Sequence, residues 1–299
     1  MEELRFDGRV AIVTGAGRGI GRAYARLLAA RGASVVVNDL GGSTEGEGSD
    51  LAPAASVVEE ITAAGGTAVA DGSDVASVDG AQHLVDTAVE RFGRIDVVVN
   101  NAGIMRWAGM PDVDADALDA HLAVHVGGSF NTTRAAWPHM VEQQYGRIVM
   151  TASAGMFGHP HNTSYATAKA GVVGLTRSIH LSGAKRGIKV NVIAPAAMTR
   201  LASPGAEEPG DDDPMAPALV APMVAYLAHE SCPVSGEVYA AGAGRFSRIF
   251  LASTPGWLAD DRPSVEDVAA HWDAINDESG YTVPTSLMDW SAGFTSHLG

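Results

Sequence analysis

The chain has 299 residues, of which 46% are hydrophobic, and it carries a formal net charge of −15. This length holds one large domain or two small ones, and the acidity disfavours nucleic acid as a partner, because nucleic-acid binders normally present a basic face. One cysteine, no secretory signal and no apolar run near the ~20 residues of a membrane span predict a cytoplasmic protein without an internal disulfide or a membrane partner.

Short β-branched runs alternate with longer amphipathic stretches through the first half of the chain. The first strand is predicted at 10–13, and a glycine-rich turn and a helix that ends at Gly32 follow it. Further strands are predicted at 35–37, 67–70 and 97–99, with helices from Pro53 to about residue 64 and around residues 84–92.

The second half continues this alternation. A long helical stretch is predicted from about residue 115 to 143, with an interruption near Gly127 and Gly128. Strands are expected at 148–150, 189–193 and 237–240, helices at 165–186 and 219–229, and a mobile loop at 196–216. Continuous apolar strands between helices predict an α/β fold, a Rossmann-like doubly wound parallel sheet of about seven strands with helices on both faces.

A glycine-rich loop follows the first strand, from Thr14 to Gly21. Glycine allows the backbone to approach a pyrophosphate closely, and the helix that begins there offers free N–H groups. Because the loop lies in a βαβ context, nucleotide binding is favoured over a purely structural turn. The predicted cofactor contacts in this loop are Gly15, Gly17, Arg18, Gly19, Ile20 and Gly21.

Asp39 ends the second predicted strand, where a carboxylate accepts hydrogen bonds from the hydroxyls of an adenosine ribose. The same carboxylate repels a 2′-phosphate, so the sequence predicts NAD in preference to NADP. Arg18 is the opposing observation, because its guanidinium is able to reach such a phosphate. The alternative for Arg18 is a contact at the entry of the helix.

Further cofactor contacts are expected at the carboxyl edge of the sheet, where ligands of such folds bind. Asp74 and Val75 follow the third strand near the expected adenine, and Asn101 follows the fourth strand near the nicotinamide ribose. The alternative for Asn101 is a turn residue that bonds its own backbone. The remaining expected contacts are Ala102, Gly103, Thr151, Pro195 and Met198.

Tyr165 and Lys169 are four residues apart on a predicted helix, and therefore share one face. A phenol has an ordinary pKa near ~10, and a neighbouring ammonium together with a positive nicotinamide ring favours the phenolate. We therefore expect the pKa of Tyr165 to be lowered by ~2–3 units. The alternative is a packed aromatic ring beside a surface lysine.

Taken together, Thr14 to Gly21, Asn100 to Gly103 and Tyr165 to Lys169 resemble the short-chain dehydrogenase/reductase family over residues 6–243. The resemblance implies that the tyrosine moves the substrate hydroxyl proton, while the lysine lowers its pKa and holds the nicotinamide ribose. It also implies that residues 1–243 form an NAD-binding domain with the catalytic site. Residues 244–299 are expected to extend the same domain, with a helix at 265–275.

In this family a serine bonds the substrate oxygen, usually thirteen residues before the tyrosine. That position is Ala152 here, and Ser153 lies one residue later. Counted from Gly146 and Arg147, Ser153 falls in register with the family serine, so we choose Ser153 and infer a one-residue deletion in the following loop.

His125 occupies a position where the family usually has an asparagine whose backbone helps to hold a water in a proton relay. A histidine is able to preserve that backbone contact, and the resemblance therefore places His125 among the catalytic residues. The alternative is that His125 caps a kink in the helix.

Several longer sequence segments resemble the (3R)-hydroxyacyl-CoA dehydrogenase unit of peroxisomal multifunctional enzymes and bacterial hydroxysteroid dehydrogenases. They include Val37 to Gly42, Phe130 to Trp137 and His229 to Cys232. The implied reaction is oxidation of a secondary alcohol on an acyl thioester or a steroid, with hydride passing to NAD.

The substrate surroundings leave alternatives open. Coenzyme A needs a local basic patch, for which Arg200, Arg245 and Arg248 are candidates, although each also reads as a surface charge. An apolar pocket wall near the nicotinamide is expected, with ordinary core packing as the alternative, at Met105, Trp107, Met156, Phe157 and Met198. His159 and His161, in the loop before Tyr165, are candidates to line the cleft.

Two further expectations concern the protein as a whole. The competing hypothesis to a dehydrogenase is a catalytically inactive NAD-binding regulatory protein on the same fold, because fold alone does not establish activity. The resemblance implies a homo-oligomer, either a tetramer or a dimer, and the apolar faces at 118–126 and 172–179 fit the interfaces that it would need. No metal is expected, since no ligand set has suitable spacing.

Overall fold

The structure is a computed structural model that describes residues 3–202, 209–210 and 212–298. Its contacts divide the chain into two compact units, Met1–Arg248 and Ile249–Gly299. The sequence placed the end of the first domain at residue 243, whereas residues 245–248 group with the first unit because they belong to a further strand. Part of the loop predicted at 196–216, residues 203–208 and 211, lies outside the described residues.

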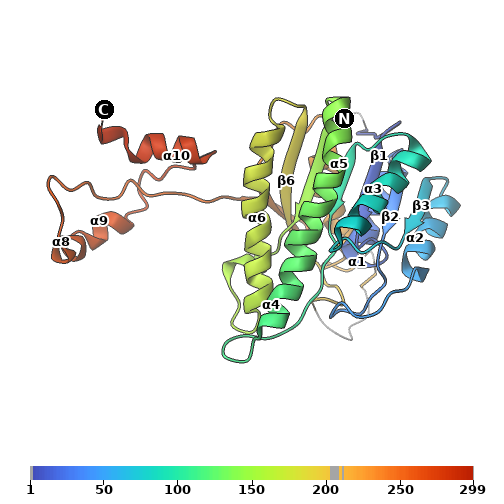
Figure 1. The fold of residues 1–299 in the computed structure, drawn as a ribbon, viewed down its shortest axis with the longest axis horizontal. Coiled ribbons are helices and arrows are strands. Elements are labelled where there is room, and N and C mark those ends of the chain that lie inside the picture. The colour runs from blue at the N-terminus through green and yellow to red at the C-terminus, as the bar shows by residue number, and fades with distance from the viewer. Residues whose placement is uncertain (1–2, 203–208, 211, 299) are drawn as a thin grey trace. The chain divides into compact units, whose positions relative to one another are not determined.

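The first unit is built on an eight-stranded sheet with the order β3-β2-β1-β4-β5-β6-β7-β8 (Figure 1). The pairings from β3 to β7 are parallel, as predicted for a doubly wound fold. The strands are β1 (Val10–Thr14), β2 (Ser34–Asn38), β3 (Thr67–Asp71), β4 (Val97–Asn100), β5 (Gly146–Thr151), β6 (Ile188–Pro195), β7 (Val238–Gly242) and β8 (Arg245–Ile249).

The seven predicted strands are confirmed, and β8 was missed. The central strands β1, β4 and β5 are buried along their whole length, which is why they read as continuous apolar runs. By contrast, the first four residues of β8 are exposed, so this edge strand carries no apolar run for a sequence pattern to detect.

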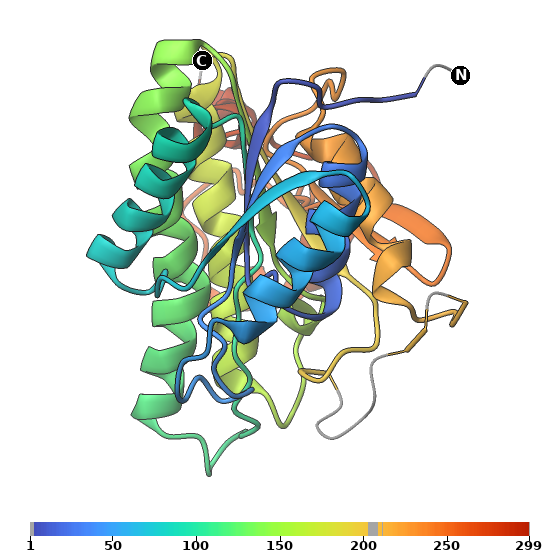
Figure 2. The ribbon, with the colours of Figure 1, turned by 90° about the vertical axis from the view of Figure 1, so that its right-hand side faces the viewer.

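Helices cover both faces of the sheet, and Figure 2 shows the two helical layers with the strands between them. The core on one side gathers residues of α1, α2 and α7 against the strands. The helices of this layer are α1 (Gly19–Ala30), α2 (Ala52–Ala63) and α7 (Ala221–Ala228). Those of the other layer are α3 (Val78–Phe92), α4 (Ala115–His121), α5 (Ser129–Gln143) and α6 (Thr163–Gly183).

A π-helical turn, Leu122–Gly128, joins α4 to α5 without the interruption that the sequence predicted. Such wider turns often occur at functional sites, because they change the direction of the side chains within a helix. Gly128 is required by a close approach, since a Cβ there would lie 2.9 Å from Cγ2 of Val75. Of the two glycines that suggested a break, Gly128 therefore marks close packing.

The second unit, residues 249–299, contains three short α-helices in its described part, α8 (Val265–Ala270), α9 (Trp272–Asn276) and α10 (Leu287–Phe294), and a 3-10 turn at Ser296–Leu298. The predicted start at Ser264 is confirmed by a capping box with Asp267, whereas the single helix predicted at 265–275 is divided at His271. None of the residues in these three helices, all of them described, is buried.

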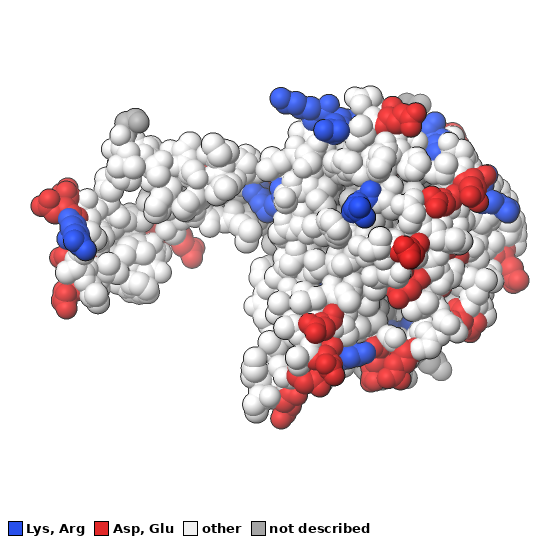
Figure 3. Space-filling model, viewed as in Figure 1, with Lys and Arg blue, Asp and Glu red and all other residues white. Residues whose placement is uncertain are grey.

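Acidic side chains gather toward the lower edge of the first unit in the view of Figure 3.

No helix within the described part of the chain combines the length and the apolar character that a bilayer crossing requires.

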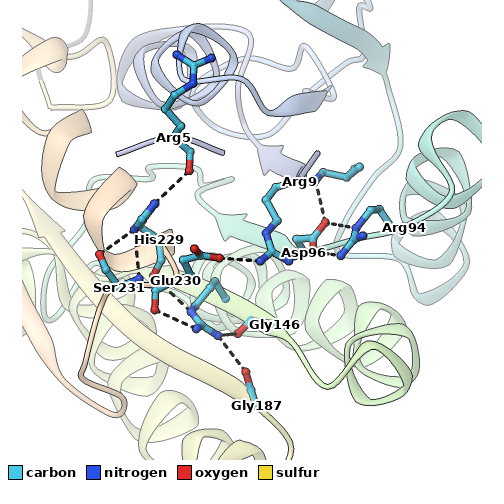
Figure 4. A network of polar contacts seen from close by, with 11 residues as sticks. Arg5, Arg9, Arg94, Asp96, Gly146, Gly187, His229, Glu230 and Ser231 are labelled. Carbon is cyan, nitrogen blue, oxygen red and sulfur yellow. Dashed lines mark hydrogen bonds and ion pairs between the residues drawn. The ribbon is translucent and has the colours of Figure 1, made fainter. Parts of the chain in front are cut away.

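A polar network ties the strands together at the amino end of the sheet, opposite the cleft described below (Figure 4). The carboxylate of Asp96, which is fully buried, accepts hydrogen bonds from Arg9 at 3.0 Å, from Arg94 at 2.7 Å and from the Val10 N–H at 2.9 Å. The guanidinium groups of Arg9 and Arg147 both lie over the ring of Tyr145, at 3.8 and 4.3 Å from its centre. Asp96 thus holds β1 against the entry of β4.

Candidate active site

A cleft of about 650 Å³ opens at the carboxyl ends of the central strands, around the point where the strand order reverses between β1 and β4. Most of the predicted site residues line it, whereas Gly17, Gly21 and Met198 do not. The predicted residues that the fold brings together are Gly15, Arg18, Gly19, Ile20, Asp39, Asp74, Val75, Asn101, Ala102, Gly103, His125, Thr151, Ser153, Tyr165, Lys169 and Pro195.

The glycine-rich loop has the shape that a phosphate group requires. Gly15 and Gly19 have φ angles of 61° and 54°, a region that favours glycine, and a Cβ on Gly21 would lie 2.2 Å from the carbonyl oxygen of Gly15. The N-terminus of α1 has no side-chain cap, so its first N–H groups remain available to an anion. A Cβ on Gly17 would lie 2.7 Å from Cβ of Pro53, so Gly17 and Gly21 allow the close packing of this loop although neither lines the cleft.

Asp39 lines the cleft and also holds this loop in place. Its Oδ2 accepts a hydrogen bond from the Gly17 N–H at 2.8 Å, and its Oδ1 accepts one from the Gly41 N–H at 2.7 Å. A carboxylate has about four lone-pair sites, so two remain for ribose hydroxyls. Sequence reasoning assigned Asp39 only to the cofactor and missed this bracing of the loop.

Arg18 adds a cationic group to the same wall. Its Nη1 is buried and has no hydrogen-bond partner among the described residues. An unpaired buried guanidinium nitrogen is stabilised by an anionic group. The loop, the helix terminus, Asp39 and Arg18 together fit a dinucleotide.

Asn101 lines the cleft, as predicted, and also braces its floor, so the alternative of a turn residue that bonds its own backbone is wrong. Its Nδ2 donates to the carbonyl oxygens of Thr14 at 2.9 Å and Gly15 at 3.0 Å, and its Oδ1 is buried without a partner among the described residues. Asn38, which sequence reasoning missed, bonds Asp71 and Ser73 in a similar way beside the cleft. A polar residue that ends an apolar strand was the available signal.

Tyr165 and Lys169 lie one turn apart on α6, as predicted. Lys169 is buried, its Nζ donates to the carbonyl oxygen of Thr151 at 2.8 Å, and this nitrogen lies 5.4 Å from the centre of the Tyr165 ring. The alternative of a surface lysine is therefore wrong.

The protein groups around this pair disfavour the charged form of both side chains. Burial raises the pKa of Tyr165 above its ordinary value, and a hydrogen bond with Ser153 opposes this effect. Burial also lowers the pKa of Lys169 from 10.5 to about 7. The lowering expected for the phenol combined the ammonium with a positive nicotinamide ring, whereas among the groups of the protein itself desolvation dominates, because the protein encloses both side chains.

Ser153 occupies the position expected of the substrate-binding serine. Its Oγ accepts a hydrogen bond from the Gly155 N–H at 3.0 Å and caps the short helical turn Ala154–Phe157. Ser153 also shares a hydrogen bond with Tyr165, whereas Ala152 is buried and has no hydroxyl. The geometry thus agrees with the register that was counted from Gly146.

His125 lies in the π-helical turn and packs edge-to-face against Tyr165, with ring centres 5.2 Å apart. Its Nε2 lies 2.9 Å from the carbonyl oxygen of Ile104, and its Nδ1 is buried without a partner among the described residues. Burial lowers the pKa of His125 well below 6.5, with the charge of Lys169 adding to the effect, so the ring is neutral at neutral pH. The hydrogen-bond contacts of this side chain go to the backbone of Ile104, outside the helix, so His125 does not cap a kink. A second histidine, His121, stacks on His125 and was missed by the sequence analysis.

The outer part of the cleft combines apolar and basic groups. Met105, Trp107 and His159 line it, as does Arg200. The other residues that the sequence suggested for this region, Met156, Phe157, His161, Met198, Arg245 and Arg248, are not among its lining residues. Arg248 instead forms an ion pair with Glu237 at 2.8 Å.

The glycine-rich insert after β2 contributes to the cleft in a way the sequence did not predict. Gly42, Ser43 and Gly46 line it, and the carbonyl oxygen of Thr44 accepts a hydrogen bond from the Met105 N–H at 2.8 Å. The insert therefore joins the nucleotide end of the cleft to its outer wall.

The buried Lys169 gives the protein a testable pH dependence. Because its pKa is lower in the folded chain than in the unfolded chain, the unfolded state binds more protons between pH ~7 and ~10, and stability rises with pH there. Lys169 is expected to contribute about 2 kcal/mol to the rise in unfolding free energy between pH ~7 and ~9. Urea denaturation without added cofactor measures this rise, which Lys169→Met should remove and Lys185→Met, at an exposed lysine, should preserve. An identical rise in Lys169→Met would contradict the assignment.

Comparison with known proteins identifies similar dehydrogenases. Residues 9–203 match the family described as short chain dehydrogenase. A short-chain type dehydrogenase/reductase of Mycobacterium tuberculosis is 46% identical over 273 residues, which cover 91% of this chain and 95% of that protein. Peroxisomal multifunctional enzyme type 2 of Mus musculus is 42% identical over 299 residues, which cover 99% of this chain and 40% of the mouse enzyme.

Among solved structures, a 7 alpha-hydroxysteroid dehydrogenase complexed with NADH and 7-oxo glycochenodeoxycholic acid matches with a TM-score of 0.71 and 30% identity. The match covers 82% of this chain and 98% of that one. The family match spans more than half of the chain, and the predicted fold and tyrosine–lysine pair accompany it. The chain therefore belongs to the short-chain dehydrogenase family and is an oxidoreductase that acts on CH–OH groups.

Proposed function

We propose that the protein is an NAD-dependent dehydrogenase that oxidises the secondary alcohol of a 3-hydroxyacyl-CoA. The observation that carries this proposal is the meeting of Ser153, Tyr165 and Lys169 in one cleft with the glycine-rich loop and Asp39. The resemblance of several sequence segments to (3R)-hydroxyacyl-CoA dehydrogenase units supports the acyl-CoA substrate, and the similarity to the mouse multifunctional enzyme extends over 99% of this chain.

In the proposed reaction, Tyr165 accepts the proton of the substrate hydroxyl while the carbon loses a hydride. The bound nicotinamide cofactor supplies the hydride acceptor. Ser153, already bonded with Tyr165, orients the substrate oxygen through a hydrogen bond from its hydroxyl. Lys169, as an ammonium, stabilises the phenolate of Tyr165 electrostatically, and the carbonyl oxygen of Thr151 holds its Nζ in position.

Histidine at position 125 suits this site because it stays neutral. A protonated imidazole beside Lys169 would place two cations in one buried pocket, and the lowered pKa of His125 avoids this. Its ring supports Tyr165 from the side, and the unpartnered Nδ1 is able to bond a water or a ligand hydroxyl, as donor or acceptor according to the tautomer of the ring.

NAD in preference to NADP is proposed from Asp39. Replacement Asp39→Ala should raise the efficiency with NADP relative to NAD roughly tenfold to hundredfold, because a charge that repels the 2′-phosphate and accepts ribose hydroxyls is lost. Efficiency with NAD should fall as well, since Gly17 and Gly41 lose their acceptor. Steady-state kinetics with both cofactors measures the ratio, and Asp50→Ala, on the same insert but outside the cleft lining, is the control. An unchanged ratio would reject the assignment.

Two features bear on the substrate. Arg200 is the one basic candidate of the sequence analysis that lines the described cleft, and it suits a phosphate of coenzyme A on an otherwise acidic protein. Met105 and Trp107 suit an apolar chain or ring. A hydroxysteroid is the second candidate, supported by the 30% identity to a steroid dehydrogenase.

The direct test is NADH formation with purified protein. Hydroxyacyl-CoA esters of both configurations at carbon 3 and a set of hydroxysteroids should be compared at matched concentrations. Turnover of one hydroxyacyl-CoA configuration in preference to the steroids is the expected result. Preference for a steroid would select the hydroxysteroid as the substrate. Cofactor binding without turnover of any alcohol or ketone would favour an inactive regulatory protein, although no observation on the described residues supports that hypothesis.

Three expectations stay predictions: the homo-oligomer, the cytoplasmic location and the status of residues 244–299 as an extension of the same domain. Exposed apolar side chains in the second unit, such as Trp272 and Leu287, are compatible with contacts between copies. Light scattering measures the oligomeric state.

A further inference from the structure

A second buried histidine lies behind the catalytic tyrosine. His121, the last residue of α4, is completely buried. Its ring stacks on His125, with centres 5.7 Å apart and planes 22° apart, and it meets the Tyr165 ring edge-on at 5.8 Å. The π-helical turn that follows His121 carries His125, so the two rings reach the same side of the helix.

The hydrogen bonds of His121 define its tautomer. Its Nε2 lies 3.2 Å from the backbone nitrogen of Arg106, which is a donor, so Nε2 must accept. The proton of the neutral ring therefore lies on Nδ1, which is 2.9 Å from both the carbonyl oxygen of Ala117 and the Oγ of Ser164. Burial lowers the pKa of His121 and keeps the ring in this neutral form.

These bonds connect two parts of the cleft that are far apart in the sequence. Arg106 lies between Met105 and Trp107, which line the outer cleft. Ser164 is buried in the first turn of α6 and directly precedes Tyr165. One imidazole thus holds the substrate side of the cleft with one nitrogen and the tyrosine end of α6 with the other.

We propose that His121 is a positioning residue for the dehydrogenase reaction, in which Nε2 fixes the Arg106 segment against the substrate and Nδ1 fixes the Ser164 end of α6 beneath Tyr165. This inference rests on the proposed function for its kinetic consequences. It does not place His121 in contact with substrate or cofactor, because His121 does not line the cleft.

The two bonds are separable by substitution. The amide nitrogen of asparagine occupies the place of Nδ1, whereas the amide oxygen of glutamine reaches the place of Nε2. His121→Asn should therefore keep the hydrogen bond to the Ser164 hydroxyl and lose the one from the Arg106 N–H. KM should then rise about fivefold to tenfold with kcat nearly unchanged. His121→Gln should keep the hydrogen bond to the Arg106 N–H and lose the one to the Ser164 hydroxyl. Because that bond fixes the start of α6 beneath Tyr165, kcat should fall about fivefold to tenfold with KM nearly unchanged.

A second readout does not depend on turnover. Hydrogen exchange at the Arg106 amide should accelerate about tenfold in His121→Asn and stay near the wild-type rate in His121→Gln. His139→Asn and His139→Gln, on α5 and outside the cleft lining, are matched controls that should change none of these quantities.

The outcomes separate the two proposals. If the wild-type protein turns over no alcohol or ketone, the proposed function fails, while the exchange rates still test the bonds of His121. Equal changes in KM and kcat in both variants, no change in either, or matching exchange rates at Arg106 would overturn the positioning role.

Discussion

Replacing Tyr165 with phenylalanine should reduce kcat by roughly 10²–10⁴-fold, the range expected for loss of a general acid–base group. The phenyl ring still fills the space against His125, so the fold and cofactor affinity should be retained. Only the hydroxyl that receives the substrate proton and bonds with Ser153 is removed.

Steady-state kinetics and calorimetric titration with NAD together measure this result. Tyr226→Phe, at an exposed tyrosine on α7, is the matched control and should leave both quantities unchanged. Turnover that survives in Tyr165→Phe would remove the basis of the proposed mechanism, whereas loss of NAD binding as well would point to a damaged fold.

Replacing Asp96 with alanine should lower the free energy of unfolding by about 3–5 kcal/mol, as is typical when one partner of a buried ion pair is lost. The change leaves the Val10 N–H without its acceptor and removes the shared partner of Arg9 and Arg94 (Figure 4). The lower part of this range is expected, because both arginines retain some access to solvent.

Denaturant unfolding monitored by circular dichroism measures the change. Asp7→Ala breaks an ion pair with Arg5 in which both side chains are exposed, and it should have no measurable effect on stability. If the two variants unfolded at the same denaturant concentration, the network at the amino end of the sheet would have no role in stability. Activity per folded molecule should be unchanged in Asp96→Ala, since this end lies opposite the cleft.

The sequence predicted those features that depend on neighbouring residues. The parallel strands were predictable because strands buried on both faces, such as β1 and β5, must be apolar throughout. The glycine-rich loop and the tyrosine–lysine spacing were predictable for the same reason, since a turn and one helical face are set by residues close in the chain. The helix start at Ser264 also follows from a local cap.

Features that depend on contacts between distant segments were not predictable. The exposed strand β8 and the short helix α10 have weak periodicity, and the π-helical turn was taken for a break in the helix. His121 was missed because its partners, Arg106 and Ser164, come from other elements. The sequence assigned Asp39 to the cofactor but did not predict that its carboxylate accepts hydrogen bonds from Gly17 and Gly41, because these bonds depend on how the loops fold together.

The electrostatics of the site show this division most clearly. The sequence by itself determined that Tyr165 and Lys169 are neighbours on one helix, and hence the family and the class of reaction. Only the tertiary structure decided that both groups are enclosed, so that burial raises the pKa of Tyr165 and lowers that of Lys169 to about 7. Spacing along a helix fixes which groups meet, whereas the cost of removing each charge from water depends on every segment that folds around them.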